Sequence, residues 1–221
     1  MTGPPTWALH RRAAIVVNVQ SLPLAQSAAS PCDTCLAGCC RGHDLVIRGS
    51  DAARISRGRG LPIAAFADLA WCSADEPGSI ALDSGEPRHR FRLQLRQVDD
   101  LHGVYTERCV FLATSKDLGR CTIYESRPAM CRAYPTTWRE GALAVVSGPF
   151  CPPDSWSLAK LDVPWHLALH EEKRRLAAID SLLEAEWNRR LASSGTPRTP
   201  EEYFTFVLEA WAGEGPHDEG L

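Results

Sequence analysis

The sequence has no hydrophobic run long enough to cross a bilayer, because proline, asparagine, glutamine or charged residues interrupt every apolar stretch. Near the N-terminus two arginines precede apolar residues 13–17, but about five such residues fall short of the roughly 7–15 that a signal peptide needs. Excess positive charge is also missing: the net charge is −3, which argues against a general nucleic-acid binder. We therefore expect a cytoplasmic protein without a membrane or nucleic-acid partner.

The sequence also lacks the motifs of common nucleotide-binding and hydrolytic enzymes. It contains no Gly-Lys-Ser/Thr phosphate loop and no Gly-x-Ser-x-Gly nucleophile motif. Gly58 and Gly60 follow an expected helix rather than a strand, so they do not form a dinucleotide-binding turn. Whether the protein is an enzyme stays undecided at this level, and the informative residue type is cysteine.

Nine cysteines occur in 221 residues, and an odd number fits poorly with a closed set of disulfides. A reducing compartment keeps such thiols free for metal or redox chemistry. Four of them form the motif Cys32-x2-Cys35-x3-Cys39-Cys40, in which the Cys-x2-Cys spacing lets a tight turn present two sulfurs to one metal. Because Cys39 and Cys40 are adjacent, we expect their side chains to point in different directions and not to share one ion.

A second block contains Cys109, Cys121 and Cys131, with Cys151 following. We expect Cys121 on a strand and Cys131 at the end of the next helical turn, which brings both within reach of a shared site. A metal bound by several thiolates carries net negative charge, and nearby guanidinium groups would offset it. The sequence places arginines beside both blocks, at Arg41, Arg127 and Arg132.

Three other candidate ligands have weaker settings. Cys72 lies in the segment Leu-Ala-Trp-Cys-Ser, and we interpret it as a small buried residue rather than a ligand. His166 and His170 stand four residues apart, a spacing that can hold zinc on a helix, but the His-Glu-x2-His order of a metalloprotease is missing. Both border an apolar stripe, so we predict a solvated helix edge for them.

The remaining pattern predicts an α+β fold: a small cysteine-rich metal-binding core of short strands and helices, covered by a long C-terminal helix. Ser50 and Asp51 are good caps for a helix that ends near residues 58–60, and Leu61-Pro62 opens a second short helix to about residue 71. Residues 91–95 alternate between apolar and polar, as in a half-buried strand. Further short strands are expected at residues 80–82, 110–113, 121–124 and 143–146, with a helical segment at 125–131 and a hairpin loop at 115–119.

The C-terminal third has helical periodicity. Trp165, Leu169 and Leu176 begin an apolar stripe that predicts an amphipathic helix over residues 164–192. Thr199 and the following Pro-Glu-Glu predict the start of another helix. We therefore divide the chain into an N-terminal arm (1–29), a cysteine-cluster metal-binding domain (30–153), a C-terminal helical extension (154–212) and a flexible tail (213–221).

Three segments together resemble one known family. They are the cysteine motif at 32–40, Cys-Val-Phe-Leu at 109–112, and Ile-Tyr-Glu-Ser-Arg-Pro and Cys-Arg-Ala-Tyr-Pro within 123–135. This combination resembles the YkgJ-type cysteine-cluster family of zinc- or iron-chelating CxxCxxCC domains over about residues 30–152, although three residues rather than two separate Cys35 from Cys39. The resemblance implies eight metal ligands: Cys32, Cys35, Cys39, Cys40, Cys109, Cys121, Cys131 and Cys151.

Several functions agree with this pattern. Cysteine-only ligation suits an iron–sulfur cluster or iron ions, which we favour slightly, and it also suits Zn²⁺ in a structural or interaction module. Larger relatives resemble flagellin lysine N-methylases that carry an iron–sulfur cluster, so an iron–sulfur-dependent protein-modifying enzyme is a further alternative. A thiol redox protein is disfavoured because the strand–motif–helix context is missing. The expected partners are metal ions, and the apolar helix faces would also suit a protein partner.

Overall fold

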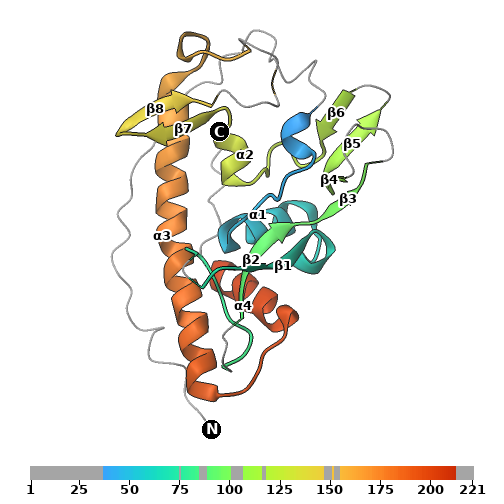
Figure 1. Ribbon diagram of the computed structural model, residues 1–221, viewed down its shortest axis with the longest axis vertical. Coiled ribbons are helices and arrows are strands. Elements are labelled where there is room, and N and C mark those ends of the chain that lie inside the picture. Colours follow the sequence, from blue (N-terminus) through green and yellow to red (C-terminus); the bar gives the residue numbers. More distant parts are fainter. Residues whose placement is uncertain are drawn as a thin grey trace. The chain divides into compact units, whose positions relative to one another are not determined.

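The computed structural model describes residues 37–74, 76–84, 89–100, 107–115, 118–146, 151 and 155–212, which all belong to one compact unit. Within these ranges, α-helices combine with short antiparallel strand pairs, which confirms the predicted α+β class with its long C-terminal helix (Figure 1). The predicted arm, its short apolar run and the C-terminal tail lie outside the described residues. Among those described, no helix has the length and apolar character needed to cross a bilayer.

Helix α1 (Gly49–Arg59) ends where predicted but begins slightly earlier: Arg48 is its N-cap, and the expected caps Ser50 and Asp51 lie within its first turn. The Arg48 backbone N–H donates to the Asp51 carboxylate (3.3 Å), which satisfies one of the exposed groups at this end. Gly60 ends the helix at φ 64°, a conformation that favours glycine. Gly49 allows a close approach of α3, since a Cβ there would lie 3.1 Å from Asp180 Oδ1.

The predicted second helix at residues 61–71 is wrong. Only a 3-10 turn, η4 (Ile63–Ala65), forms there, and strand β1 (Ala67–Cys72) follows. β1 pairs antiparallel with β2 (Arg90–Leu95), which confirms the strand expected from alternation at 91–95. Pairing with β2 overrides the local helix preference of this segment, because the neighbouring strand supplies hydrogen-bond partners for its backbone groups. Of the strand expected at 80–82, only an isolated bridge from Ile80 to Phe91 is present.

Three further hairpins follow. β3 (Gln97–Asp99) pairs with β4 (Glu107–Cys109), β5 (Leu112–Ser115) with β6 (Leu118–Cys121), and β7 (Thr136–Arg139) with β8 (Ala142–Val145). The strands expected at 110–113 and 121–124 are therefore shifted, because Ser115 pairs with Leu118 and the hairpin is tighter than predicted. The expected helical segment at 125–131 forms slightly later, as α2 (Ala129–Ala133).

The predicted C-terminal helices are confirmed as α3 (Val163–Ser194) and α4 (Pro200–Ala212). The capping box that opens α4 is present: Glu202 N–H donates to Thr199 Oγ1 (3.2 Å) and Thr199 N–H donates to the Glu202 carboxylate (2.8 Å). Helix α3 contacts α2 and β7 along one part of its length and α1 and α4 along another (Figure 1). It thereby links the cysteine-bearing segments to the main apolar core.

The interior between α1, α3 and α4 is aromatic, and we call it the helical core. Its buried side chains contact one another edge-on or tilted, with 5.1 Å between the ring centroids of Trp187 and Tyr203. The Trp187 indole N–H donates to the Ala81 carbonyl oxygen (2.8 Å), so its polar atom is satisfied. The core residues are Ile55, Leu176, Trp187, Tyr203, Phe204, Val207 and Trp211.

Candidate metal centre

The adjacent cysteines of the first block lie on a 3-10 turn, η3 (Gly38–Cys40). Ala37 precedes this turn at φ 55°, and the tight backbone brings the two sulfurs to 3.9 Å from each other. The expectation that these side chains diverge is therefore wrong. Two sulfurs bound to one tetrahedral zinc with bonds of about 2.3 Å would be about 3.8 Å apart, so the observed separation suits a shared metal. Cys32 and Cys35 lie outside the described residues.

Backbone pairing brings this turn to the second block. The backbone of Arg41 forms an isolated antiparallel β-bridge with that of Arg108, and the Gly42 N–H donates to the Glu107 carbonyl oxygen (3.0 Å). Cys40 therefore lies beside the end of β4, where Cys109 is buried with 5% of its surface exposed. Backbone hydrogen bonds join residues that are about 65 positions apart in sequence here, and spacing within the sequence does not predict such long-range pairing.

Two more cysteines reach the same place from the following hairpin and helix. Cys121 ends β6 opposite Leu112, as expected of a cysteine on a strand, and the Thr122 N–H continues the pairing by donating to the Phe111 carbonyl oxygen (2.9 Å). Cys131 lies within α2, one short connection later. We call Cys39, Cys40, Cys109, Cys121 and Cys131 the thiol cluster.

The pKa values within the thiol cluster show that its members act on one another. Burial is the main cause that raises the pKa of Cys109 to about 11 and that of Cys131 to about 12, and neighbouring thiolates of the cluster contribute to both shifts. Burial likewise raises the pKa of Cys121. A hydrogen bond from the Cys40 thiol lowers the pKa of Cys39 to about 7, and the same bond, together with burial, raises the pKa of Cys40.

These shifts have a direct chemical consequence. Several partly buried thiols that disfavour each other's ionisation stay mostly protonated unless a cation is present, and a cation would displace their protons. Thiolates are soft ligands that select zinc, iron–sulfur clusters and other thiophilic metals. Across the described residues, no three cysteine, histidine or acidic side chains stand at the spacing of a closed metal site. The donor chemistry of the cluster nevertheless fits such a metal.

Arg127 supplies positive charge to this cluster. Its guanidinium lowers the pKa of Cys39 and of Cys121, after the larger effects of hydrogen bonding and burial. The side chain is held by a hydrogen bond from Nε to the Tyr124 carbonyl oxygen (2.8 Å), and it lies 3.6 Å above the Tyr124 ring. The other two arginines singled out in the sequence pair with carboxylates, Arg41 with Asp100 and Arg132 with Glu172.

Cys151 and Cys72 have different surroundings. The Cys151 sulfur lies 2.6 Å from the Tyr134 hydroxyl, a contact that no spacing rule indicated. Cys72 is only half buried at the end of β1, so the interpretation of a fully buried residue is too strong. Burial raises the pKa of Cys72, and the charges that act on it next are those of Glu76 and two arginines. No member of the thiol cluster is among the causes of that shift.

The predicted solvated edge for the two histidines is wrong for His166, which is buried with 4% of its surface exposed. His166 Nδ1 and His170 Nε2 lie 3.1 and 3.0 Å from the same Thr136 hydroxyl oxygen, and that hydroxyl donates to the Ala133 carbonyl oxygen (2.7 Å). Burial lowers the pKa of both histidines. The two histidines therefore connect α3 to Thr136, which follows α2, although the sequence pattern predicted that they face solvent.

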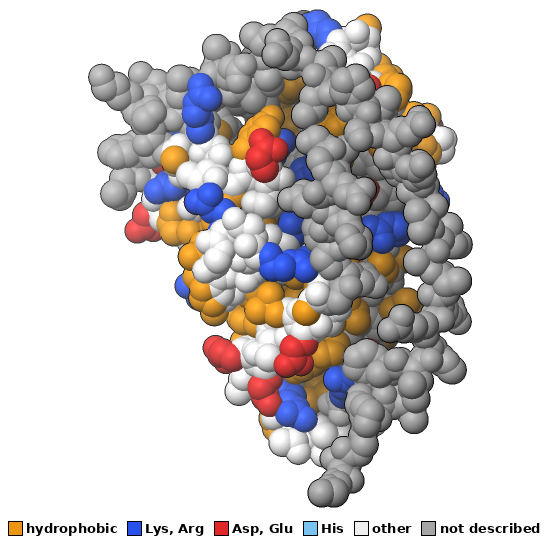
Figure 2. Space-filling model, turned by 180° about the vertical axis from the view of Figure 1, so that it is seen from behind, with side chains coloured by type: hydrophobic (Ala, Val, Ile, Leu, Met, Phe, Trp, Pro, Cys, Tyr) orange, Lys and Arg blue, Asp and Glu red, His pale blue; other side chains and the backbone are white. Residues whose placement is uncertain are grey.

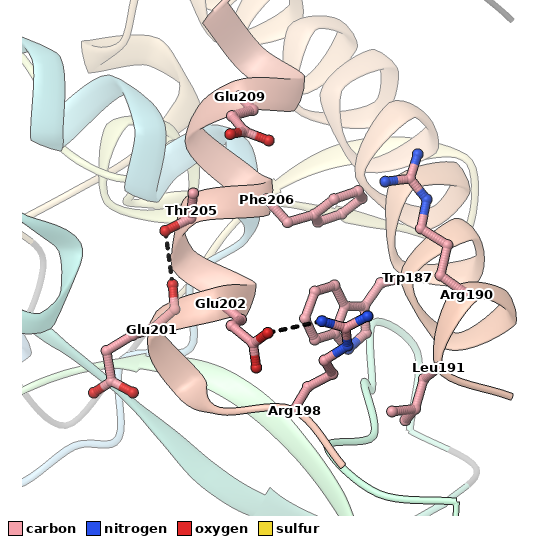
Figure 3. A pocket seen from close by; sticks show the side chains of 9 residues that line it. All are labelled: Trp187, Arg190, Leu191, Arg198, Glu201, Glu202, Thr205, Phe206 and Glu209. Atoms are coloured by element: carbon pink, nitrogen blue, oxygen red, sulfur yellow. Dashed lines mark hydrogen bonds and ion pairs between the residues drawn. The ribbon is translucent and has the colours of Figure 1, made fainter. Parts of the chain in front are cut away.

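A separate pocket of about 370 Å³ lies between the C-terminal part of α3 and α4 (Figure 3). Trp187 and Phe206 form its apolar wall, and the ion pair between Arg198 and Glu202 (2.7 Å, dashed line in Figure 3) lies at its rim. None of its lining residues is a cysteine or histidine. The pocket is thus not part of the thiol cluster.

Charged side chains are dispersed on the face shown in Figure 2. Among the residues described there, lysine and arginine side chains lie between hydrophobic and acidic ones and do not collect in one basic area. Nucleic-acid binding normally requires such an area, because the phosphate backbone supplies most of the affinity.

Comparison with known proteins agrees with the cysteine geometry. The sequence matches the model of the CxxCxxCC family, described as "Putative zinc- or iron-chelating domain", over residues 31–152. Searches of the curated proteins and of the solved structures found no match. The matched segment covers more than half of the chain and contains the whole thiol cluster together with Cys32, Cys35 and Cys151. The chain therefore belongs to the CxxCxxCC family of zinc- or iron-chelating domains.

Proposed function

We propose that the protein holds an iron–sulfur cluster through cysteine thiolates supplied by both blocks. The observation that carries this proposal is the mutual effect of five thiols, contributed by η3, β4, β6 and α2, on one another's pKa. One tetrahedral zinc and one 2Fe–2S or 4Fe–4S cluster each take four protein ligands, so five thiols plus those of Cys32, Cys35 and Cys151 correspond to two sites or to one site with spare thiols. Iron–sulfur clusters are held by cysteine thiolates, and their potentials respond to burial and nearby charge.

The residues of the chain would have distinct tasks in such a centre. The five cluster thiols would bind the metal together with Cys32, Cys35 and Cys151, and Arg127 would offset the negative charge of the thiolates. The apolar side chains packed against Cys109 would limit access of water. In this proposal residues 30–153 form the metal-binding domain, residues 154–212 cover it, and the free thiols require a reducing compartment such as the cytoplasm.

Zinc is the second candidate, and one observation favours it. The 3.9 Å between the sulfurs of Cys39 and Cys40 matches two ligands of a single tetrahedral zinc. A zinc centre would be structural: it would replace apolar packing in a region of short hairpins and contribute directly to the free energy of folding. The two candidates differ in colour, redox behaviour and sulfide content.

The test is purification without oxygen followed by a visible spectrum and assays of iron, acid-labile sulfide and zinc. We expect a coloured protein with iron and sulfide in similar amounts, and we expect Cys32→Ser or Cys35→Ser to lose metal and thermal stability together. A colourless protein with stoichiometric zinc would replace the iron–sulfur proposal with the zinc one. A metal-free protein that folds normally would exclude both.

A further inference from the structure

Asp51 makes contacts that a simple helix cap does not need. It is buried on α1 with 4% of its surface exposed. One carboxylate oxygen accepts the Arg48 N–H of its own helix (3.3 Å), and the other accepts the backbone N–H of Ala129 (2.8 Å), a residue 78 positions later. Ala129 is the first residue of α2, the helix that contains Cys131. One carboxylate therefore joins the starts of two helices.

Arg54, one turn further along α1, completes this arrangement. Its Nη2 donates to Asp51 (2.7 Å) and also to the Arg127 carbonyl oxygen (2.6 Å). Pro128, between the two anchored backbone positions, is fully buried. Asp51 and Arg54 therefore hold the chain on both sides of this proline. We call these two residues the α1 clamp.

A helix as short as α2 needs such support. Five residues form too few internal hydrogen bonds to offset the cost of nucleating a helix, so its position depends on tertiary contacts. The clamp fixes the start of α2 two residues before Cys131 and also fixes the backbone of Arg127, whose guanidinium acts on the thiol cluster. Partners one shell away from a metal often set the orientation of the ligands and the electrostatics of the centre.

We propose that Asp51 and Arg54 are positioning residues of the metal centre: together they place Cys131 and Arg127 relative to the other thiols. This inference rests on the proposed metal-binding function. It predicts that the clamp controls how tightly metal is held and how the thiolates interact with it, without itself ligating the metal.

The test compares Asp51→Asn with the wild type, both loaded with native metal to equal content. Asparagine keeps the size of the side chain but removes the charge and one of the acceptors, so we expect about tenfold faster transfer of metal to a chromogenic chelator. We also expect a shift of the thiolate-to-metal absorption band, measured on the iron protein or on a Co²⁺-substituted protein if the native metal is zinc. Asp180→Asn is the matched control, because Asp180 is also a buried carboxylate that accepts a backbone N–H at the start of α1. This variant should release metal at a rate within twofold of the wild-type rate.

Equal release rates and an unchanged band in Asp51→Asn would overturn the proposal, as would equally fast release from Asp180→Asn, because that result would indicate general destabilisation. Arg54→Lys provides a second variant if Asp51→Asn does not fold. Its ammonium keeps the charge but lacks the planar geometry that reaches both acceptors, so release should also be faster than in the wild type, and an unchanged rate would count against the clamp. A wild-type protein that binds no metal would instead refute the proposed function itself.

Discussion

The helical core and the thiol cluster lie in the same compact unit but have interiors of different chemistry. The helical core is filled by aromatic and aliphatic side chains, and the Trp187 indole N–H within it donates to the Ala81 carbonyl oxygen. The thiol cluster is surrounded by two-stranded hairpins and a one-turn helix, and its side chains shift one another's pKa. Two-stranded hairpins are marginally stable alone. We therefore expect the first region to fold on apolar burial alone and the second, which shares only part of that apolar packing, to gain stability from a bound metal.

Cys109→Ser should give the largest effect and affect the two regions unequally. Cys109 is buried and interacts with at least three other thiols of the cluster. A hydroxyl is a poor ligand for a soft metal, so we expect nearly complete loss of metal. Hydrogen exchange measured by mass spectrometry should then show faster exchange in β4–β6 and α2, while the contact region of α3 and α4 stays protected.

Trp187→Ala is the matched variant in the helical core. Removing a buried tryptophan typically costs about 3–5 kcal/mol of the free energy of unfolding, so the melting temperature should fall strongly. The metal content per folded molecule should stay at the wild-type value. Loss of metal from Trp187→Ala at temperatures where the protein is folded would show that metal binding depends on the packing of the helical core.

Asp180→Asn should have a smaller effect that depends on pH. Burial raises the pKa of Asp180 to about 6 and that of nearby Glu184 to about 7, although Ser50 donates two hydrogen bonds to Asp180 and Arg48 pairs with Glu184. The folded protein therefore retains protons that the unfolded chain releases. The contribution of these two carboxyls to the free energy of unfolding therefore decreases as pH rises from about 4 through their folded pKa values.

The Asn variant removes the contribution of Asp180 and also the part of the Glu184 shift that the Asp180 charge causes, so the fall in stability between about pH 4 and 6 should become shallower, by on the order of 2 kcal/mol over the window. Urea unfolding at several pH values measures this slope. Glu171→Gln, an exposed carboxylate on the same helix, is the control and should leave the slope unchanged. Identical slopes for the wild type and Asp180→Asn would mean that the carboxyl ionises normally in the folded state.

The two regions also differ in how far the sequence predicts them. The C-terminal helices follow from local signals: a period of 3.6 residues and the Thr199 to Glu202 capping box, which both act within one turn. The helix expected at 61–71 fails because β1 is stabilised by β2, whose paired residues lie 18 to 28 positions away in sequence. Local propensity is a weak guide where a strand partner is supplied by the fold.

The same contrast applies to the metal centre. Spacing within each cysteine block indicates which residues are candidates, but their assembly depends on the bridge between Arg41 and Arg108 and on the tight hairpin of β5 and β6. The contact between Cys151 and Tyr134 and the support of Ala129 by Asp51 join residues 17 and 78 positions apart, for which the sequence offers no periodic signal. Residue type thus predicts the chemistry of the centre, and tertiary pairing determines its geometry.

Cys72→Ser should have the smallest effect and sharpens the boundary of the metal region. Cys72 is half buried at the end of β1, where charges of Glu76 and nearby arginines act on it. A thiol-to-hydroxyl change at such a position should alter the free energy of unfolding by no more than about 0.5–1 kcal/mol, with metal content unchanged. Metal assays on Cys72→Ser and Cys131→Ser, purified side by side without oxygen, compare the same chemical change at two positions. Of these two residues, Cys131 interacts with the thiol cluster and Cys72 does not, so we expect metal to be lost from the Cys131→Ser variant alone. Equal loss from both variants would add Cys72 to the eight proposed ligands and would place β1 within the metal centre.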